Sequence, residues 1–153
     1  MHVDENIKTK AEQFKREGYT NFERVKVLDV TPRINEVIKN LIGFDATGYQ
    51  IYSNTNTYKH IEDGHGENGK HDQSMKDMRD VALMTYVLEN FDYAELVLNS
   101  KGDIDITNAF VDRNGNPSKM IKFTKIIDGK IHVVIATPEN KYKKLWVISE
   151  YKE

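Results

Sequence analysis

Residues 120–137 read MIKFTKIIDGKIHVVIAT and give the clearest indication of how the chain folds. Two runs rich in Ile, Val, Phe and Thr flank Asp128-Gly129, a pair that favours the type I′ turn of a two-residue β-hairpin. A two-residue turn fixes the pairing register, so the sequence predicts that Lys125 lies opposite His132. The stretch therefore predicts two antiparallel strands that meet at this turn.

A third strand is expected after the hairpin. Residues 138–140 read Pro-Glu-Asn, which is turn chemistry, and residues 145–151 read LWVISEY, which is rich in strand-forming residues. Side chains alternate between the two faces of a strand. Alternation predicts one face with Leu145, Val147, Ser149 and Tyr151, and the other with Trp146, Ile148, Glu150 and Lys152. The C-terminal third thus predicts a three-stranded antiparallel meander.

Helices are expected mainly in the earlier part of the chain. Thr31 and Pro32 suit the N-cap and first position of a helix that stops at Gly43. Gly64 is expected to end the next helix in the chain, and Ser74 to cap the last helix. The expected helices cover residues 4–17, 32–42, 55–64 and 74–88, and earlier strands are expected over residues 22–30, 49–52, 93–98 and 106–111. This order predicts an α+β protein with N-terminal helices packed on a small C-terminal antiparallel β-sheet.

We expect an N-terminal helical extension, residues 1–20, followed by a single α+β domain, residues 21–153. The first helix carries only Ile7, Ala11 and Phe14 on one narrow apolar stripe. We expect this stripe to dock on the domain or on a partner.

Composition excludes several classes of protein. The length of 153 residues suits one domain, and 39% hydrophobic residues argue against a disordered chain. No apolar run approaches the roughly 20 residues that span a bilayer, and we expect no secretory signal. The absence of Cys excludes disulfides, thiolate zinc sites and a Cys nucleophile, and it suits a reducing compartment.

Charge is distributed unevenly. The formal net charge of -2 counts against a protein that coats nucleic acids without specificity. Residues 117–153, however, hold eight Lys and four acidic residues. This tail either forms a face that attracts phosphates or carries Lys that protects exposed strands from aggregation.

His60 and His65 are the first candidates for chemistry. An imidazole titrates near neutral pH, which suits the transfer of protons. The two residues would lie about 140° apart on one continuous helix. We expect His65 to reach the cleft of His60 because Gly64 ends the helix before it. The alternatives are two surface His, or a metal site completed by His71 and neighbouring acids, although no recognised ligand spacing is present.

Polar side chains on the predicted sheet are further candidates. Lys125 beside His132 is a pair that can bind a phosphate, and the hydroxyls of Ser149 and Tyr151 can hydrogen-bond one. The alternative is an exposed polar stripe on a half-buried sheet.

Three segments, in this order and spacing, resemble a known family. They are Ser53 to Ile61 followed by His65, Phe123 to Gly129 leading into Val133 to Ile135, and Leu145 to Lys152. The chain resembles the phage-associated branch of the Barnase–EndoU–colicin–RelE (BECR) nuclease fold over residues 25–153. Members of this branch occur as toxin domains in mobile elements and as phage head-associated proteins.

The resemblance implies a metal-independent endoribonuclease without a cofactor. His60 and His65 would act from the helical side of a cleft as acid and base, so that the RNA 2′-hydroxyl attacks the phosphate. Lys125 would stabilise the developing charge from the sheet side. Ser149 and Tyr151 would act beside it, and Lys122 and His132 would contact the substrate.

The implied partners are RNA and, for a toxin or phage effector, an immunity or inhibitor protein; no membrane is expected. The expected location is the cytoplasm of a bacterial host or of a target cell. Two alternatives stay open. One is a non-catalytic phage or mobile-element protein of the same fold that binds a protein partner. The net negative charge of residues 1–116 and the polar first helix favour this alternative. The other is a hydrolase with a metal held by His60, His65 and His71.

Overall fold

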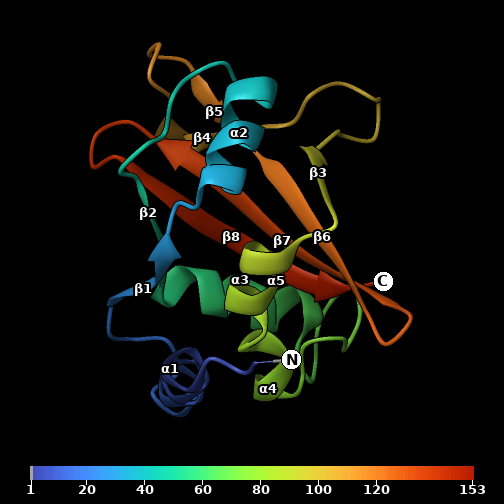
Figure 1. The fold of residues 1–153 in the computed structure, drawn as a ribbon. Coiled ribbons are helices and arrows are strands. Elements are labelled where there is room, and N and C mark those ends of the chain that lie inside the picture. Colours follow the sequence, from blue (N-terminus) through green and yellow to red (C-terminus); the bar gives the residue numbers. More distant parts are fainter. Residues whose placement is uncertain (1) are drawn as a thin grey trace.

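The computed structural model describes residues 2–153, which form five helices and eight strands (Figure 1). The helices are α1 (Glu5–Arg16), α2 (Pro32–Leu41), α3 (Thr55–His65), α4 (Met78–Val81) and α5 (Met84–Asn90). The strands are β1 (Arg24–Asp29), β2 (Gln50–Asn54), β3 (Tyr93–Leu96), β4 (Ile106–Val111), β5 (Pro117–Lys119), β6 (Ile121–Ile127), β7 (Lys130–Glu139) and β8 (Lys144–Lys152).

The hairpin of β6 and β7 has the predicted turn and register. Asp128 and Gly129 both have positive φ angles, 51° and 76°, as a type I′ turn requires. Lys125 lies opposite His132 in the ladder, as predicted. A two-residue turn therefore sets the pairing of β6 with β7 in the sheet.

The sheet is larger than predicted and is not confined to the C-terminus. Six strands form it in the order β1-β2-β8-β7-β6-β3, and a separate pair joins β4 to β5. β2 lies parallel to β8, and the remaining neighbours in the sheet are antiparallel. The chain is a mixed α and β protein, but the expected order of helices first and strands last is wrong. The parallel strands β2 and β8 are far apart in sequence, so no local turn motif predicts their pairing.

The helix predicted over residues 74–88 is also wrong. Two short helices, α4 and α5, occupy this region, and α4 ends at its C-cap residue Ala82. Asp77 caps α4, whereas the Ser74 hydroxyl accepts a hydrogen bond from the Lys152 N–H at 3.0 Å. Ser74 therefore holds a loop against β8 instead of starting a helix.

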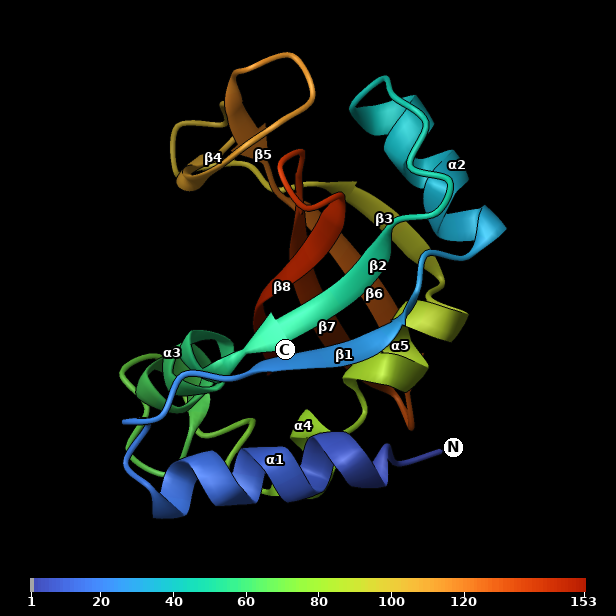
Figure 2. The ribbon, with the colours of Figure 1, turned by 90° about the vertical axis from the view of Figure 1, so that its left-hand side faces the viewer.

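The two faces of the sheet have different coverings. α2 and α5 lie on one side of it, and β4, β5 and α3 lie on the other (Figure 2). The hydrophobic core includes Phe123 and Val134 from the sheet together with Ile7 and Phe14 from α1. The narrow apolar stripe of α1 thus packs into the same core as the rest of the chain.

Candidate active site

β2 pairs only with the first residues of β8, and α3 lies beside the rest of that strand. The Asn54 side chain ends β2 and caps α3 by accepting a hydrogen bond from the Thr57 N–H at 3.2 Å. The Thr57 hydroxyl donates to the Val147 carbonyl oxygen at 2.8 Å, which ties the helix to β8. The helix that carries His60 and His65 therefore runs along the strand that carries the predicted hydroxyls.

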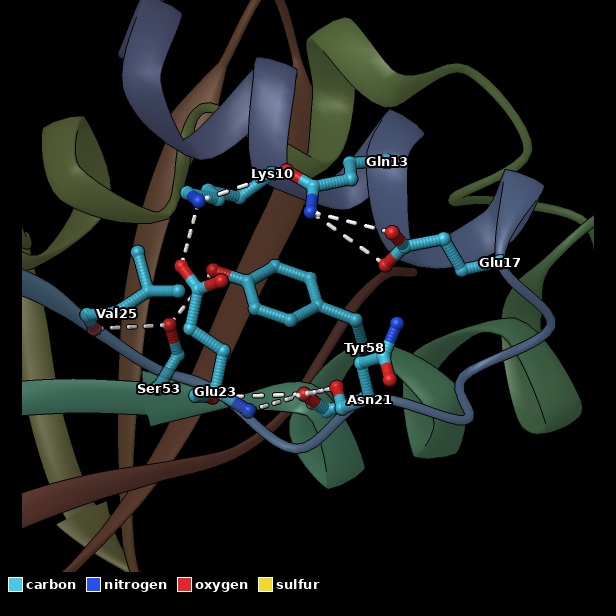
Figure 3. Close-up of polar contacts among 9 residues, drawn as sticks. Lys10, Gln13, Glu17, Asn21, Glu23, Val25, Ser53 and Tyr58 are labelled. Carbon is cyan, nitrogen blue, oxygen red and sulfur yellow. Dashed lines mark hydrogen bonds and ion pairs between the residues drawn. The ribbon is translucent and has the colours of Figure 1, made fainter.

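A buried hydroxyl pair fixes α3 against β1 and β2. Figure 3 shows the Tyr58 hydroxyl, which lies 2.6 Å from the Ser53 hydroxyl. Ser53 donates to the Val25 carbonyl oxygen at 3.2 Å, so Tyr58 is the donor to Ser53. Burial raises the pKa of Tyr58 well above its ordinary range, which keeps the phenol protonated. This bond sets the position of the helix on the side opposite the cleft.

The loop after α3, residues 66–75, folds back onto the end of the helix. Four of its backbone N–H groups donate to the carbonyl oxygens of the last three residues of α3, at 2.8, 2.9, 2.9 and 3.2 Å. Such carbonyls have no partner within a helix. Gly69 permits the close approach, because a Cβ there would lie 2.3 Å from the Asp72 carbonyl oxygen. The fold-back brings His71 and Asp72 next to His65.

His65 is the last residue of α3, so the helix does not end at Gly64 as predicted. Its Nδ1 lies 3.0 Å from Asp72 Oδ1, although the angle leaves Nδ1 without a hydrogen bond among residues 2–153. Its ring stacks on Tyr151, with centroids 5.0 Å apart and an angle of 24° between the planes. The His71 ring lies 5.6 Å away on centroids.

Asp72 is held in its charged form. Partial burial acts against that form, but the hydrogen bond from the Ser74 N–H and the nearby His65 ring outweigh it and lower the pKa of Asp72. A carboxylate beside an imidazole orients the ring and stabilises positive charge on it. The loop therefore supplies His65 with an orienting anion.

A β-bulge aligns the polar groups of β8. Val147 and Ser149 pair with consecutive residues of β7, which leaves Ile148 between them without a partner in the ladder. Ser149 and Tyr151 share a face, as predicted, but the extra residue also turns Trp146 onto that face. Simple alternation along β8 is therefore wrong at this point. Bulges of this kind occur next to active sites, where they re-aim a side chain.

An open cleft of about 600 Å³ lies between α3, its loop and the sheet. His60, His65, Ser149 and Tyr151 line it, so the structure brings four of the five proposed catalytic residues together. The prediction from sequence did not include the positively charged Lys70, which lines it too. The position of Lys70 in the Gly-rich loop directly after His65 was the only signal for it. The other lining residues are Asp63, Gly64, His71, Val97, Asp105, Met120, Ile135 and Ile148.

Lys125 and His132 do not reach this cleft. They share the opposite face of the sheet, because residues along β6 alternate between faces. The Lys125 Nζ lies 3.0 Å from an Asp92 carboxylate oxygen. Lys122 is on the cleft face, and its Nζ lies 3.3 Å from a Glu153 carboxylate oxygen. Lys122 and Lys125 are three residues apart on β6, so their side chains lie on opposite faces of the sheet.

His132 belongs to the protein interior. It is 1% exposed, and its Nε2 lies 2.7 Å from Oε2 of Glu150, which is 0% exposed. Burial raises the pKa of Glu150 to about 7, and the contact with His132 opposes this shift. The Glu150 Oε1 has no hydrogen-bond partner among residues 2–153. The pair is part of the core and does not contact a substrate in the cleft.

Within residues 2–153, no group of three or more His, Cys, Asp or Glu is arranged to hold a metal ion. No helix among the same residues is long and apolar enough to cross a bilayer.

Comparison with known proteins found one family. A family model described as phage-Barnase-EndoU-ColicinE5/D-RelE like nuclease3 matches residues 29–153. The match spans all of the residues that line the cleft. No curated protein and no solved structure gives a significant match to the chain.

Proposed function

The chain belongs to the phage-Barnase-EndoU-ColicinE5/D-RelE like nuclease family, and we propose that it is a metal-independent endoribonuclease. The observation that carries this proposal is the convergence of His60 and His65 on one cleft with the hydroxyls of Ser149 and Tyr151. Two imidazoles can serve as the general base and the general acid for cleavage of RNA by its own 2′-hydroxyl, and hydroxyls can hydrogen-bond the phosphate.

In the proposed reaction, His65 takes the proton of the 2′-hydroxyl while the 2′-oxygen attacks the adjacent phosphorus. The bond from phosphorus to the 5′-oxygen breaks, and His60 gives that oxygen a proton. The products are a 2′,3′-cyclic phosphate and a 5′-hydroxyl. His65 suits the base because Asp72, 3.0 Å from its Nδ1, stabilises the positive charge that the ring gains.

Residues of the sheet and of the loop stabilise the negative charge on the phosphate oxygens. Ser149 and Tyr151 offer hydroxyl donors, and burial raises the pKa of Tyr151, which keeps its proton in place. Lys70 supplies positive charge at the same cleft. Donors and a cation aimed at a developing charge lower the barrier of such a step. In this proposal Lys70 has the role that the resemblance implied for Lys125.

The test is incubation of the purified chain with RNA in EDTA, beside His60→Ala and His65→Ala. We expect wild type to give fragments that end in 2′,3′-cyclic phosphate. Loss of a general acid or base costs about 10²- to 10⁴-fold in rate, so both variants are expected to fall at least about 100-fold. His2→Ala is the matched control, because His2 is an exposed His outside the cleft.

Each contrary result has a definite meaning. Intact RNA with wild type would reject the ribonuclease and favour the non-catalytic protein. Cleavage that EDTA abolishes and added divalent metal restores would reject metal independence. Full activity of both His variants would reject the proposed acid and base.

A further inference from the structure

A second pocket opens on the other side of His60. It has a volume of about 230 Å³ and lies between the first turns of α3, strand β4 and the first half of β8. His60 lines both this pocket and the cleft described above. A ligand group in the second pocket would therefore lie next to the proposed site of chemistry.

Two aromatic rings form one wall of this pocket. The rings of Phe110 and Trp146 lie almost parallel, with centroids 5.9 Å apart and 9° between the planes. Trp146 is held in place because its Nε1 donates to a carboxylate oxygen of Glu139 at 3.0 Å. Phe110 comes from β4 and is partly exposed. A fixed aromatic wall with an accessible ring is the kind of surface on which an unpaired base stacks.

Two amide side chains also line the pocket. Asn54 uses its side-chain oxygen to cap α3, whereas the exposed side chain of Asn56 makes no hydrogen bond within residues 2–153. An amide carries both donors and an acceptor, as the edge of a base does. An apolar pocket with a few polar groups is typical of small-molecule and cofactor sites.

Resting on the ribonuclease proposed above, we infer that this pocket binds a nucleobase adjacent to the cleaved phosphate. The base stacks on Phe110 and its edge meets Asn56. Only an unstacked base enters such a pocket, so the substrate class is single-stranded RNA. A third hollow continues past Phe110 to Lys141, which places a cation further along the same path.

Trp146 reports directly on this pocket, because it is the only Trp of the chain. The probe is a 2′-O-methyl dinucleotide, which the proposed reaction cannot cleave. We expect a saturable change in Trp fluorescence, and none with a dinucleotide of equal charge that lacks both bases. Phe110→Ala is expected to weaken binding about fivefold or more, the lower end for loss of one base stack.

Asn56→Ala provides a second variant on an exposed helical position, where folding is not at risk. It is expected to weaken binding about two- to tenfold, as for one lost hydrogen bond. Asn40→Ala is its matched control, because Asn40 is also an exposed helical Asn but lies in α2. Far-ultraviolet circular dichroism checks the fold of each variant, and Asn56→Ala decides the question if Phe110→Ala does not fold.

The subsite is rejected if the abasic probe changes the fluorescence as much as the dinucleotide does. It is also rejected if folded Phe110→Ala and Asn56→Ala both bind as wild type does. RNA cleavage is measured in parallel, which separates the two proposals. Base-dependent binding without cleavage would reject the ribonuclease alone, and cleavage without base-dependent binding would reject the subsite alone.

Discussion

The buried pair of Glu150 and His132 predicts how the stability of the protein depends on pH. Burial raises the pKa of Glu150 from its ordinary value of 4.5 to about 7. The folded state therefore binds this proton more tightly than the unfolded chain does. The resulting stabilisation is fully present below pH 4.5 and is lost as the pH rises through about 7.

The size of the effect follows from the shift. One unit of pKa corresponds to 1.36 kcal/mol, so the free energy of unfolding should fall by about 3 kcal/mol across this window. Asp80 and Lys152 also face the pair; Asp80 raises and Lys152 lowers the pKa of Glu150. The carboxyl groups with lowered pKa values lose their stabilisation only as the pH falls through and below their ordinary 3.8; they are Asp29, Asp45, Asp72 and Asp92. The fall between pH 4.5 and 7 is thus assigned to Glu150.

The variant Glu150→Gln tests this assignment. Gln keeps the shape of the side chain and a hydrogen-bonding group for His132, but it does not titrate. Urea unfolding followed by circular dichroism at pH 5, 6, 7 and 8 gives the free energy of unfolding for each protein. We expect the fall in wild type to disappear in Glu150→Gln and to remain in Glu89→Gln, an exposed control. Parallel pH profiles for wild type and Glu150→Gln would show that Glu150 does not cause the fall.

Three further predictions concern single side chains. Tyr58→Phe removes the donor to Ser53, and we expect urea unfolding to show a loss of about 1 kcal/mol; an unchanged midpoint would contradict the bond. Gly129→Ala places a side chain at a φ of 76°, and the same assay should show a loss of about 1 kcal/mol or more, unless the turn is not type I′. Lys125→Ala should keep RNA cleavage within about twofold, because the exposed Asp92 pair contributes little and lies away from the cleft; a loss of 100-fold would return Lys125 to the site.

Some local signals predicted the local structure correctly, although the expected cap at Ser74 was wrong. Asp128-Gly129 fixed the hairpin and its register, because a two-residue turn with two positive φ angles accepts few other sequences. Thr31 caps α2 in front of Pro32, as its position indicated. These features depend on residues close in sequence, so one chain is enough to predict them.

Long-range pairing was not predictable in the same way. β2 joins β8 across more than 90 residues, and nothing near either strand announces the parallel ladder. The bulge at Ile148 could not be predicted either, because the sequence of this segment has the pattern of a regular alternating strand. The loop can fold back because Gly69 has no Cβ that would collide with the backbone around it. The sequence alone does not distinguish this glycine from the others in the loop. These three features place the aromatic wall, the helix and the loop of the site.

The two roles of histidine in this protein follow from that geometry. His132 and His65 are the same chemical group, but one lies in the core beside Glu150 and the other lies at the open edge of β8. β2 ends at Asn54, and the chain turns into a helix there instead of continuing along β8. A longer β2 would pair with the second half of β8 and occupy the place where α3 now carries His60 and His65. The early end of one strand therefore creates the cleft, and the capping residues that end it are as necessary to the site as the groups that line it.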